Sequence, residues 1–390
     1  MTHSISLLFI LPILALNLSA DPILSSWFTK YSGQYARIYE TAANESALNS
    51  VTTWSHPNNG SGQALPTYAG VHEIAYTENN VYIRTSGLGF HIMGPWYLNE
   101  ARTNLFPNYP ANSSAIFRFP RAPGIPPISK TVTGNGTIGY FVDGIGMFDS
   151  RDAFSYSNSN AGDARPNSNF TGDGIWNRDA YINESVTFDS ANAHQAGINH
   201  HYHANPPALR HLIGGSVDYD ASTNTYTESF NGQHSPILGW VRDGYPIYGP
   251  YGYDDPDDAT STVRRMISGY TTRDGSNGTT NLSDTGRTLL PNWAAVAQGI
   301  NAALTTTQYG PAVSATYPLG HYIEDYDYLG HQGLTLGSDF DLDEHNGRFC
   351  KTPEYPDGTY AYFVSIDAFG TPTYPYNIGR TFYGSPTGAT

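Results

Sequence analysis

The chain has 390 residues, of which 34 are acidic and 19 are basic, so its formal net charge is −15. A chain this acidic is not drawn to nucleic acid or anionic lipid by its overall field, and we expect no nucleic-acid partner. Its single cysteine, Cys350, excludes an intramolecular disulfide. The 30 tyrosines and 40 glycines are typical of extracellular β-structure with long ordered loops.

Residues 1–20 have the layout of a secretory signal peptide. A short polar start precedes an apolar run from Leu7 to Leu16, and the small residues Ser19 and Ala20 stand just before Asp21. The run is too short for a transmembrane span, and no later segment approaches the ~20 apolar residues that a span needs. The sequence therefore predicts no membrane insertion and a mature protein that is secreted or periplasmic.

Residues 21–125 alternate short β-like runs with clusters of turn residues. Residues 81–85 and 114–119 have the composition of strands. The proline-rich stretch 119–127 has few free N–H groups and fixed φ angles, so it is expected to run extended. We interpret it as a connector between an N-terminal β-rich segment, 21–125, and a second domain, 126–390.

In the second domain, strand-like patterns are frequent and helical patterns are scarce. The clearest helix prediction covers residues 292–304, which are rich in alanine and follow a proline. The predicted fold is mainly β, either β-sandwich-like or a mixed β body, with long ordered loops and one or two short helices. The strands are expected at residues 138–142, 185–188, 216–219, 225–230, 237–241 and 360–366.

The segment 198–207, INHHYHANPP, is the densest group of imidazoles in the chain. In an extended segment, residues i and i+2 point to the same face, so His201 and His203 are placed to bind one ion. Two imidazoles at this spacing suit zinc, copper or iron. His200 points to the opposite face and is the poorer ligand. The prolines that follow end the strand, so His203 lies near a strand end, where sites usually open.

Further ligands are expected from nearby segments. His194 lies on the turn before the His-x-His strand, His234 opens the next candidate strand, and Asp243 closes it. If these two strands are neighbours, His234 or Asp243 can face the His-x-His pair. The candidate metal ligands are therefore His201, His203, His194, His234 and Asp243. The alternative is that these histidines bond to backbone and acidic groups in loops without any metal.

Two other stretches have a composition that permits binding. The acidic runs 323–328 and 339–344 offer alternating oxygens to calcium, although they also suit solvated loops. In residues 239–253, aromatic side chains alternate with glycine and proline, which favours either stacking on sugar rings or a self-packed core. No motif of a serine hydrolase, a phosphate-binding loop or a zincin helix occurs, so no catalytic residue is assigned.

Taken together, these stretches resemble the YHYH-domain family, which is named after a Tyr-His-Tyr-His motif. His201, Tyr202 and His203 match the last three positions of that motif, and His200 stands where it has its first tyrosine. The resemblance implies an exported, β-rich protein and favours a metal at His201 and His203. The residues that carry it are 144–154, 174–180, 192–197, 201–207, 234–240 and 243–250.

Two classes of function follow from the sequence. The first is a secreted metalloprotein that holds zinc or copper, where zinc implies hydrolysis or hydration and copper implies oxidative chemistry. The second is a non-enzymatic binding module for a glycan, a small molecule or a surface partner, through the aromatic stretch and the acidic loops. A glycosidase with two carboxylates is a third hypothesis, for which the sequence assigns no pair. The oligomeric state is left open.

Overall fold

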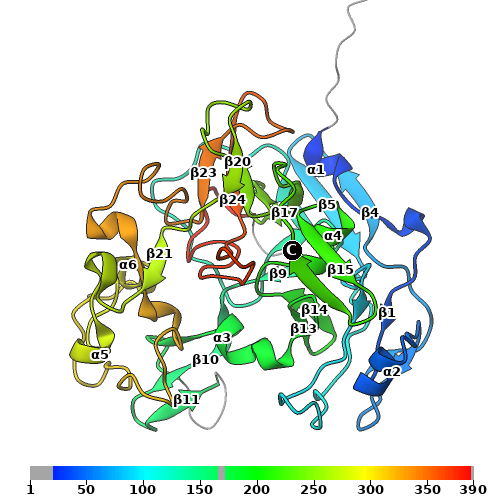
Figure 1. Ribbon diagram of the computed structural model, residues 1–390, viewed down its shortest axis with the longest axis horizontal. Helices are drawn as coiled ribbons and strands as arrows, with labels where there is room; N and C mark the ends of the chain where they lie inside the picture. The colour runs from blue at the N-terminus through cyan, green and yellow to red at the C-terminus, as the bar shows by residue number, and fades with distance from the viewer. Residues whose placement is uncertain (1–20, 166–171, 388–390) are drawn as a thin grey trace, which may run out of the picture.

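The computed structural model describes residues 21–165 and 172–387. The predicted signal peptide, 1–20, lies outside the described residues. Within them, the chain forms a β-rich body of many short strands, small sheets and long ordered loops, as predicted (Figure 1). No helix in these two ranges is long and apolar enough to cross a membrane.

The largest element is a mixed sheet of eight strands, in the order β13-β14-β9-β8-β17-β18-β24-β23. The pairs β14–β9 and β18–β24 are parallel, and the other neighbours are antiparallel. Every residue of β17 is buried, as expected for a strand that is covered on both faces. The strands are β8 (Thr137–Phe141), β9 (Gly146–Phe148), β13 (Ala193–Ala196), β14 (Asn199–Tyr202), β17 (Ile237–Val241), β18 (Pro246–Tyr248), β23 (Gly347–Cys350) and β24 (Thr359–Phe363).

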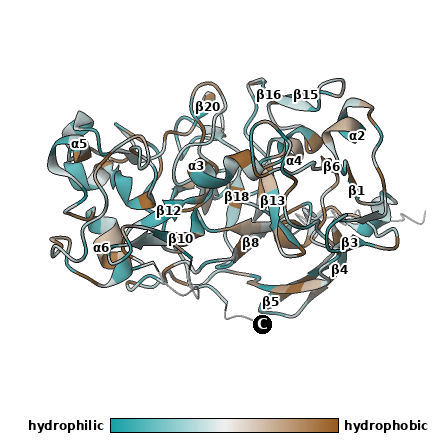
Figure 2. Ribbon diagram, turned by 90° about the horizontal axis from the view of Figure 1, so that it is seen from below, coloured by the Kyte–Doolittle hydropathy of each residue, from teal (hydrophilic) through white to brown (hydrophobic). Residues whose placement is uncertain are grey.

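The N-terminal segment packs directly against this sheet. Its three-stranded antiparallel sheet has the order β4-β5-β7, with β4 at Val71–Tyr76, β5 at Asn80–Thr85 and β7 at Ala115–Pro120. Figure 2 shows β4 and β5 along the lower edge of the molecule, with β8 above β5 and nearer the centre. The buried side chains of Val81 and Phe119 belong to the same hydrophobic core as Trp240 of the large sheet. The two parts of the chain therefore share this core, and the N-terminal segment has a further hydrophobic cluster of its own around Trp54 and Trp96.

Smaller elements surround the large sheet. A three-stranded sheet, β11-β10-β12, leads directly into helix α3, and the hairpin β13–β14 follows α3 along the chain. The small sheets comprise β1 (Arg37–Ile38) with β6 (Ile92–Met93), β2 (Trp54–Ser55) with β3 (Gly62–Gln63), β10 (Arg151–Ser157) with β11 (Gly162–Ala164) and β12 (Asn177–Asp179), β15 (Val217–Asp220) with β16 (Thr225–Glu228), β19 (Tyr251–Tyr253) with β20 (Val263–Arg265), and β21 (Tyr270–Thr272) with β22 (Tyr326–Tyr328).

The helices of the described residues are short, as the sequence predicts, but there are six α-helices rather than one or two. The predicted helix 292–304 stops at Gln298, because Gly299 takes the left-handed conformation with a φ of 67°. The helices are α1 (Pro22–Ser25), α2 (Ala42–Ser46), α3 (Ala180–Glu184), α4 (Pro207–Leu212), α5 (Leu282–Thr285) and α6 (Asn292–Gln298).

One strand prediction is wrong. Residues 185–188 do not form a strand, because the chain leaves α3 in a 3₁₀ turn, Ser185–Thr187, which is closed by a hydrogen bond from the Phe188 amide to the Ser185 carbonyl. The other predicted strands are present within two residues of their expected starts, at β5, β7, β8, β15, β16, β17 and β24.

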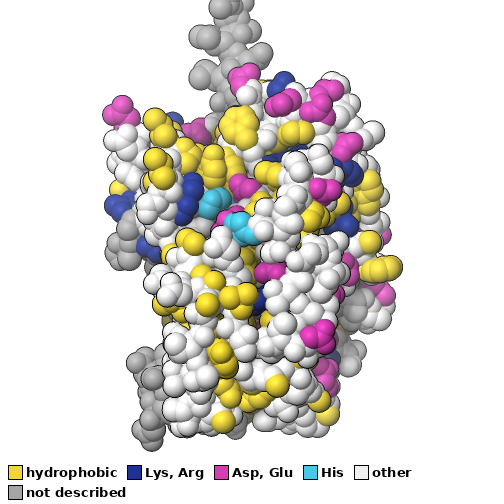
Figure 3. Space-filling model, turned by 90° about the vertical axis from the view of Figure 1, so that its left-hand side faces the viewer, with side chains coloured by type: hydrophobic (Ala, Val, Ile, Leu, Met, Phe, Trp, Pro, Cys, Tyr) yellow, Lys and Arg dark blue, Asp and Glu magenta, His cyan; other side chains and the backbone are white. Residues whose placement is uncertain are grey.

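The surface in Figure 3 carries charges of both signs, and the single cysteine is buried. On the face shown in Figure 3, basic side chains are interspersed with acidic ones and do not gather into a patch. Cys350 is fully buried in β23, and burial raises the pKa of its thiol, so it behaves as a small packed side chain.

Candidate metal centre

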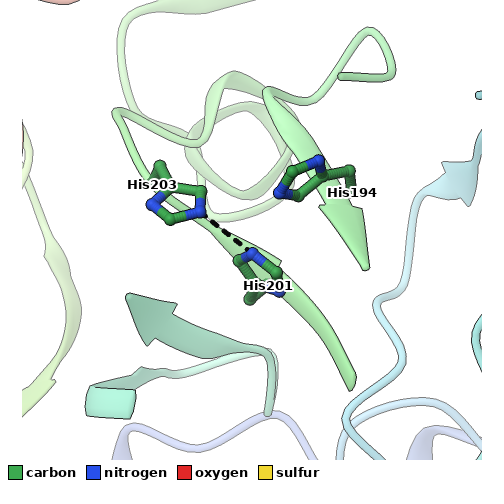
Figure 4. A group of neighbouring side chains, drawn as sticks. All are labelled: His194, His201 and His203. Atoms are coloured by element: carbon green, nitrogen blue, oxygen red, sulfur yellow. Dashed lines mark hydrogen bonds between the residues drawn. The ribbon is translucent and has the colours of Figure 1, made fainter. Parts of the chain in front are cut away.

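The hairpin β13–β14 brings three imidazoles together. His194 on β13 lies directly opposite His201 on β14, and His203 follows the end of β14. A two-residue turn sets this register, and its first residue, Gly197, has the positive φ of 62° that such turns require. Figure 4 shows the three rings turned toward one another above the hairpin. The predicted same-face placement of His201 and His203 is therefore present, and His194 joins them.

The distances between the rings fit a single ion. The Nε2 atoms of His201 and His203 are 3.0 Å apart. One ring nitrogen from each of His194, His201 and His203 lies within 4.8 Å of the other two, and all three residues are buried. Two nitrogens bound to one tetrahedral zinc at the usual ~2.0 Å are about 3.3 Å apart. The cluster therefore has the spacing of a metal centre.

Backbone oxygens fix the protons of two of these rings. The Nδ1 atom of His201 lies 2.9 Å from the Asn199 carbonyl oxygen, and that of His203 lies 2.8 Å from the Asp149 carbonyl oxygen. A carbonyl only accepts, so each Nδ1 carries the hydrogen and each Nε2 keeps a free lone pair. These are the contacts that orient histidine ligands in metal sites.

The third ring is oriented by a hydroxyl. The Nδ1 atom of His194 lies 2.7 Å from the Thr187 Oγ1 atom, and this hydroxyl donates its own hydrogen to the Glu184 carbonyl at 2.6 Å. Its oxygen is then left to accept from the His194 Nδ1–H group. All three Nε2 atoms consequently turn unprotonated lone pairs toward the same point.

Burial keeps the three imidazoles neutral. It lowers the pKa of His203 to about 4, and the pKa values of His194 and His201 lie well below the ordinary value for the same reason. Neutral rings are the form that binds metal. The contact of 3.0 Å between the Nε2 atoms of His201 and His203, dashed in Figure 4, is a hydrogen bond only if one of these nitrogens carries a hydrogen. With both hydrogens on Nδ1, two lone pairs face each other, and a cation between them removes their repulsion.

A carboxylate that sequence reasoning missed stands beside the rings. Glu184, the last residue of α3, places its Oε2 atom 3.5 Å from the Nε2 atom of His203 and 3.7 Å from that of His194. Burial, reinforced by the nearby carboxylate of Asp152, raises the pKa of Glu184 to about 8. Nothing in its local sequence marks Glu184, because the helix α3 brings it to the hairpin.

The cluster opens into a cavity of about 800 Å³. The three histidines and Glu184 line it. Leu98 and Phe106 of the N-terminal segment contribute to the lining, and other lining residues include Phe148, Arg151, Asp152, Phe154 and Arg178.

Asp149 and Asp152, of which Asp152 lines the cavity, differ in charge. Arg151 binds Asp149 at 2.7 Å, and although burial alone would raise the pKa of Asp149, Arg151 and Arg380 hold it at about 2. Asp152 pairs instead with Arg178 at 2.7 Å, and burial raises its pKa to about 7. Asp149 is therefore ionised at neutral pH, whereas Asp152 titrates near pH 7.

His234 and Asp243 are not brought to this cluster. In the large sheet, β9 and β8 lie between β14 and β17, so the two candidate strands are not neighbours. The His234 ring packs against Tyr248 and Tyr253, and its Nδ1 atom lies 2.7 Å from the Ser235 carbonyl. Asp243 accepts hydrogen bonds from the Tyr362 hydroxyl at 2.7 Å and from the Gly384 amide at 2.8 Å.

Several carboxylates of the two acidic runs are bonded to other side chains of the protein. Asp325 forms two bonds of 2.7 Å with Arg287, and Asp341 binds Arg264 at 2.6 Å. The Tyr360 hydroxyl donates to Asp343 at 2.8 Å. Calcium binding at these runs stays a prediction from the sequence.

The aromatic stretch 239–253 is largely internal. Trp240, Tyr248 and Tyr251 are buried in or beside the large sheet. These three rings therefore contribute to packing and leave no face for a sugar to stack on. Glycan binding stays a prediction that rests on composition.

Comparison with known proteins places the chain in a family. The sequence model of the YHYH protein family matches residues 116–376, a range that holds His194, His201, His203 and Glu184. No curated protein and no solved structure matches the chain. Because the matched range is more than half of the sequence, the chain belongs to the YHYH family.

Proposed function

We propose that this protein is an exported metalloprotein that binds one zinc or copper ion through the Nε2 atoms of His194, His201 and His203. The observation that carries the proposal is the hydrogen bonding of the three rings. The Nδ1 atoms of His201 and His203 face carbonyl oxygens, which only accept, and that of His194 faces the Thr187 hydroxyl, whose hydrogen goes to the Glu184 carbonyl. The Nε2 lone pairs of all three rings are therefore free for a metal. The layout of residues 1–20 supports export.

The cavity supports a catalytic use of the ion. A zinc ion held by three imidazoles supplies a Lewis acid. Glu184 lies beside two of the ligands, where its carboxylate can take a proton from a group held in the cavity or return one to it. Phe148 offers apolar surface, whereas the guanidinium of Arg178 is already paired with Asp152, so the cavity suits a substrate with an apolar part. The reaction classes that fit are hydrolysis and hydration.

Elemental analysis of protein purified without a histidine tag tests the proposal. We expect the double variant His201→Ala/His203→Ala to contain one equivalent of zinc or copper less than the wild type. The variant His211→Ala is the control, because His211 is exposed and outside the cluster, and its metal content should equal that of the wild type. Equal metal in the double variant and the wild type, or no metal in either after titration with both ions, would overturn the proposal.

A further inference from the structure

A second group of candidate ligands lies on the other face of β14. It comprises His91, Asp189 and His200, and one ligand atom from each lies within 4.8 Å of the other two. His200 precedes His201 on the strand, so its side chain points away from the first cluster. His91 comes from the N-terminal segment, just before β6, and Asp189 precedes β13.

His200 is the least explained polar side chain in this group. It is 2% exposed, and neither of its ring nitrogens has a hydrogen-bond partner at normal geometry; the backbone of His194 offers only a weaker contact. A buried polar group without a partner costs about 1–3 kcal/mol, so such groups are rare in folded proteins. The Trp96 ring packs edge-on at 5.6 Å and supplies no polar contact to the imidazole. His200 is therefore placed to bind a group from outside the protein.

The carboxylate of Asp189 is held rigidly. Its Oδ1 atom accepts from the amides of Ala191 at 3.0 Å and Ala193 at 3.3 Å, and its Oδ2 atom accepts from the Gly94 amide at 2.8 Å. The side chain is fully buried. Its Oδ2 atom lies 3.7 Å from the Nε2 atom of His91, which is too far for a hydrogen bond.

The Nε2 atom of His91 makes no hydrogen bond of normal length. It has no partner within that range, and it faces the Oδ2 atom of Asp189 across 3.7 Å. On the other side of the ring, the Tyr202 hydroxyl, which donates to Asp143 at 3.1 Å, lies 3.5 Å from the Nδ1 atom. The space between the His91 Nε2 atom and the Asp189 carboxylate is therefore bordered by two potential ligand atoms.

We propose that His91, Asp189 and His200 form a second, structural zinc site. Two ligand atoms of one tetrahedral zinc are about 3.3 Å apart, close to the separation of His91 and Asp189. Two imidazole nitrogens and one carboxylate oxygen are a ligand set that zinc accepts.

The position of this site assigns its role. His91 lies before the range 116–376 that the family model matches, whereas Asp189 and His200 lie within it. The ion therefore joins the N-terminal segment to the β13–β14 hairpin. With one cysteine in the chain, no intramolecular disulfide can make that connection.

Two measurements test the second site independently of the first. Elemental analysis should find two metal equivalents in the wild type, and one equivalent less in His91→Asn. His56→Asn is the matched control, because His56 is also buried in the N-terminal segment, with its Nε2 atom 2.8 Å from the Phe106 carbonyl and its Nδ1 atom accepting from the Asn58 amide. This control should keep both ions even if it loses stability.

The second measurement needs no variant. Crystals of the wild-type protein, measured on both sides of the zinc absorption edge, should show an anomalous peak between His91, Asp189 and His200. Absence of that peak overturns the proposal. Because this measurement uses the wild-type protein, it decides the question even if His91→Asn fails to fold.

The outcomes separate the two sites. One equivalent in the wild type that persists in His91→Asn and disappears in His201→Ala/His203→Ala overturns the second site and supports the first. One equivalent that disappears in His91→Asn and persists in the double variant supports the second site and overturns the first. No metal in the wild type after titration overturns both, and His200 then has only water as a partner.

Discussion

The hydroxyl of Thr187 is the hydrogen-bond partner of the His194 Nδ1 atom, so a change at this one atom should alter metal affinity at the proposed site. In Thr187→Val the shape is nearly kept but the acceptor for the His194 Nδ1–H group is lost. We expect metal affinity to fall about 10- to 100-fold, which is typical when such an orienting partner is removed. Competition with a chromophoric chelator measures the affinity.

The variant Thr187→Ser is the control, since it keeps the hydroxyl, and it should bind metal nearly as tightly as the wild type. An equal fall of metal affinity in both variants would mean that the packing of the Thr187 side chain matters, and not the hydrogen bond alone. An unchanged affinity in Thr187→Val would mean that the tautomer of His194 does not depend on this contact.

Sequence reasoning found the residues that local geometry determines. The alternation of a strand places His201 and His203 together, and a tight turn brings His194 to them. It missed Glu184, because the placement of α3 depends on contacts that are distant in the sequence. It set His200 aside as a ligand of the first cluster, which agrees with the structure, but its neighbours His91 and Asp189 on the other face depend on tertiary packing.

Among the elements, β8 and β17 approach unusually closely at the centre of the large sheet. Gly239 pairs with Phe141, and a Cβ atom added to Gly239 would lie 2.6 Å from the Tyr140 carbonyl oxygen. Gly239→Ala should therefore force the strands apart and lower the free energy of unfolding by about 3 kcal/mol. Urea denaturation measures this change.

Gly124→Ala is the control for that substitution. Gly124 has no atom within 4 Å of the added Cβ atom and lies outside any strand, so its free energy of unfolding should change by less than about 0.5 kcal/mol. A Gly239→Ala variant as stable as this control would show that the two strands tolerate a wider separation.

The positions of most strands could be predicted from the sequence, but the order of the strands in the large sheet could not. The hydrophobic patterns at residues 137–141 and 237–241 are strong because these strands are covered on both faces. His234 or Asp243 could face the His-x-His pair only if the two strands were neighbours, and this condition is not met, because β9 and β8 lie between them. Pairing of this kind is decided by contacts between distant segments, which no local pattern records.

At the scale of the whole molecule, buried ionisable groups determine how stability depends on pH. Burial raises the pKa of Asp179 to about 8 and those of Asp152 and Glu324 to about 7. Between the ordinary pKa of a carboxyl and these raised values, the folded state binds more protons than the unfolded state. The free energy of unfolding therefore falls as pH rises through this range. Buried imidazoles such as His203 have lowered pKa values and act in the opposite direction, but only below their ordinary value of 6.5.

Above pH 6.5 the carboxyls act alone, so stability of the metal-free protein should fall between pH 6.5 and 8.5. We expect the thermal midpoint to drop by on the order of 5 °C, measured by calorimetry in chelator. In Asp179→Asn the drop should be smaller, because the amide keeps an oxygen to accept from the Ile182 amide and has no proton to lose. A rising midpoint over this range would contradict the assignment of raised carboxyl pKa values.

The two proposed ions differ in the distance along the chain between their ligands, and this bears on the order of binding and folding. His194, His201 and His203 lie within ten consecutive residues, so an unfolded chain already offers the first ion its ligands. Affinity for the unfolded chain subtracts from the stability that an ion confers. His91 reaches Asp189 and His200 only after the N-terminal segment has docked. The first ion can therefore be loaded during synthesis with little effect on stability, whereas the second can bind only at the end of folding and resists unfolding with nearly its full binding free energy.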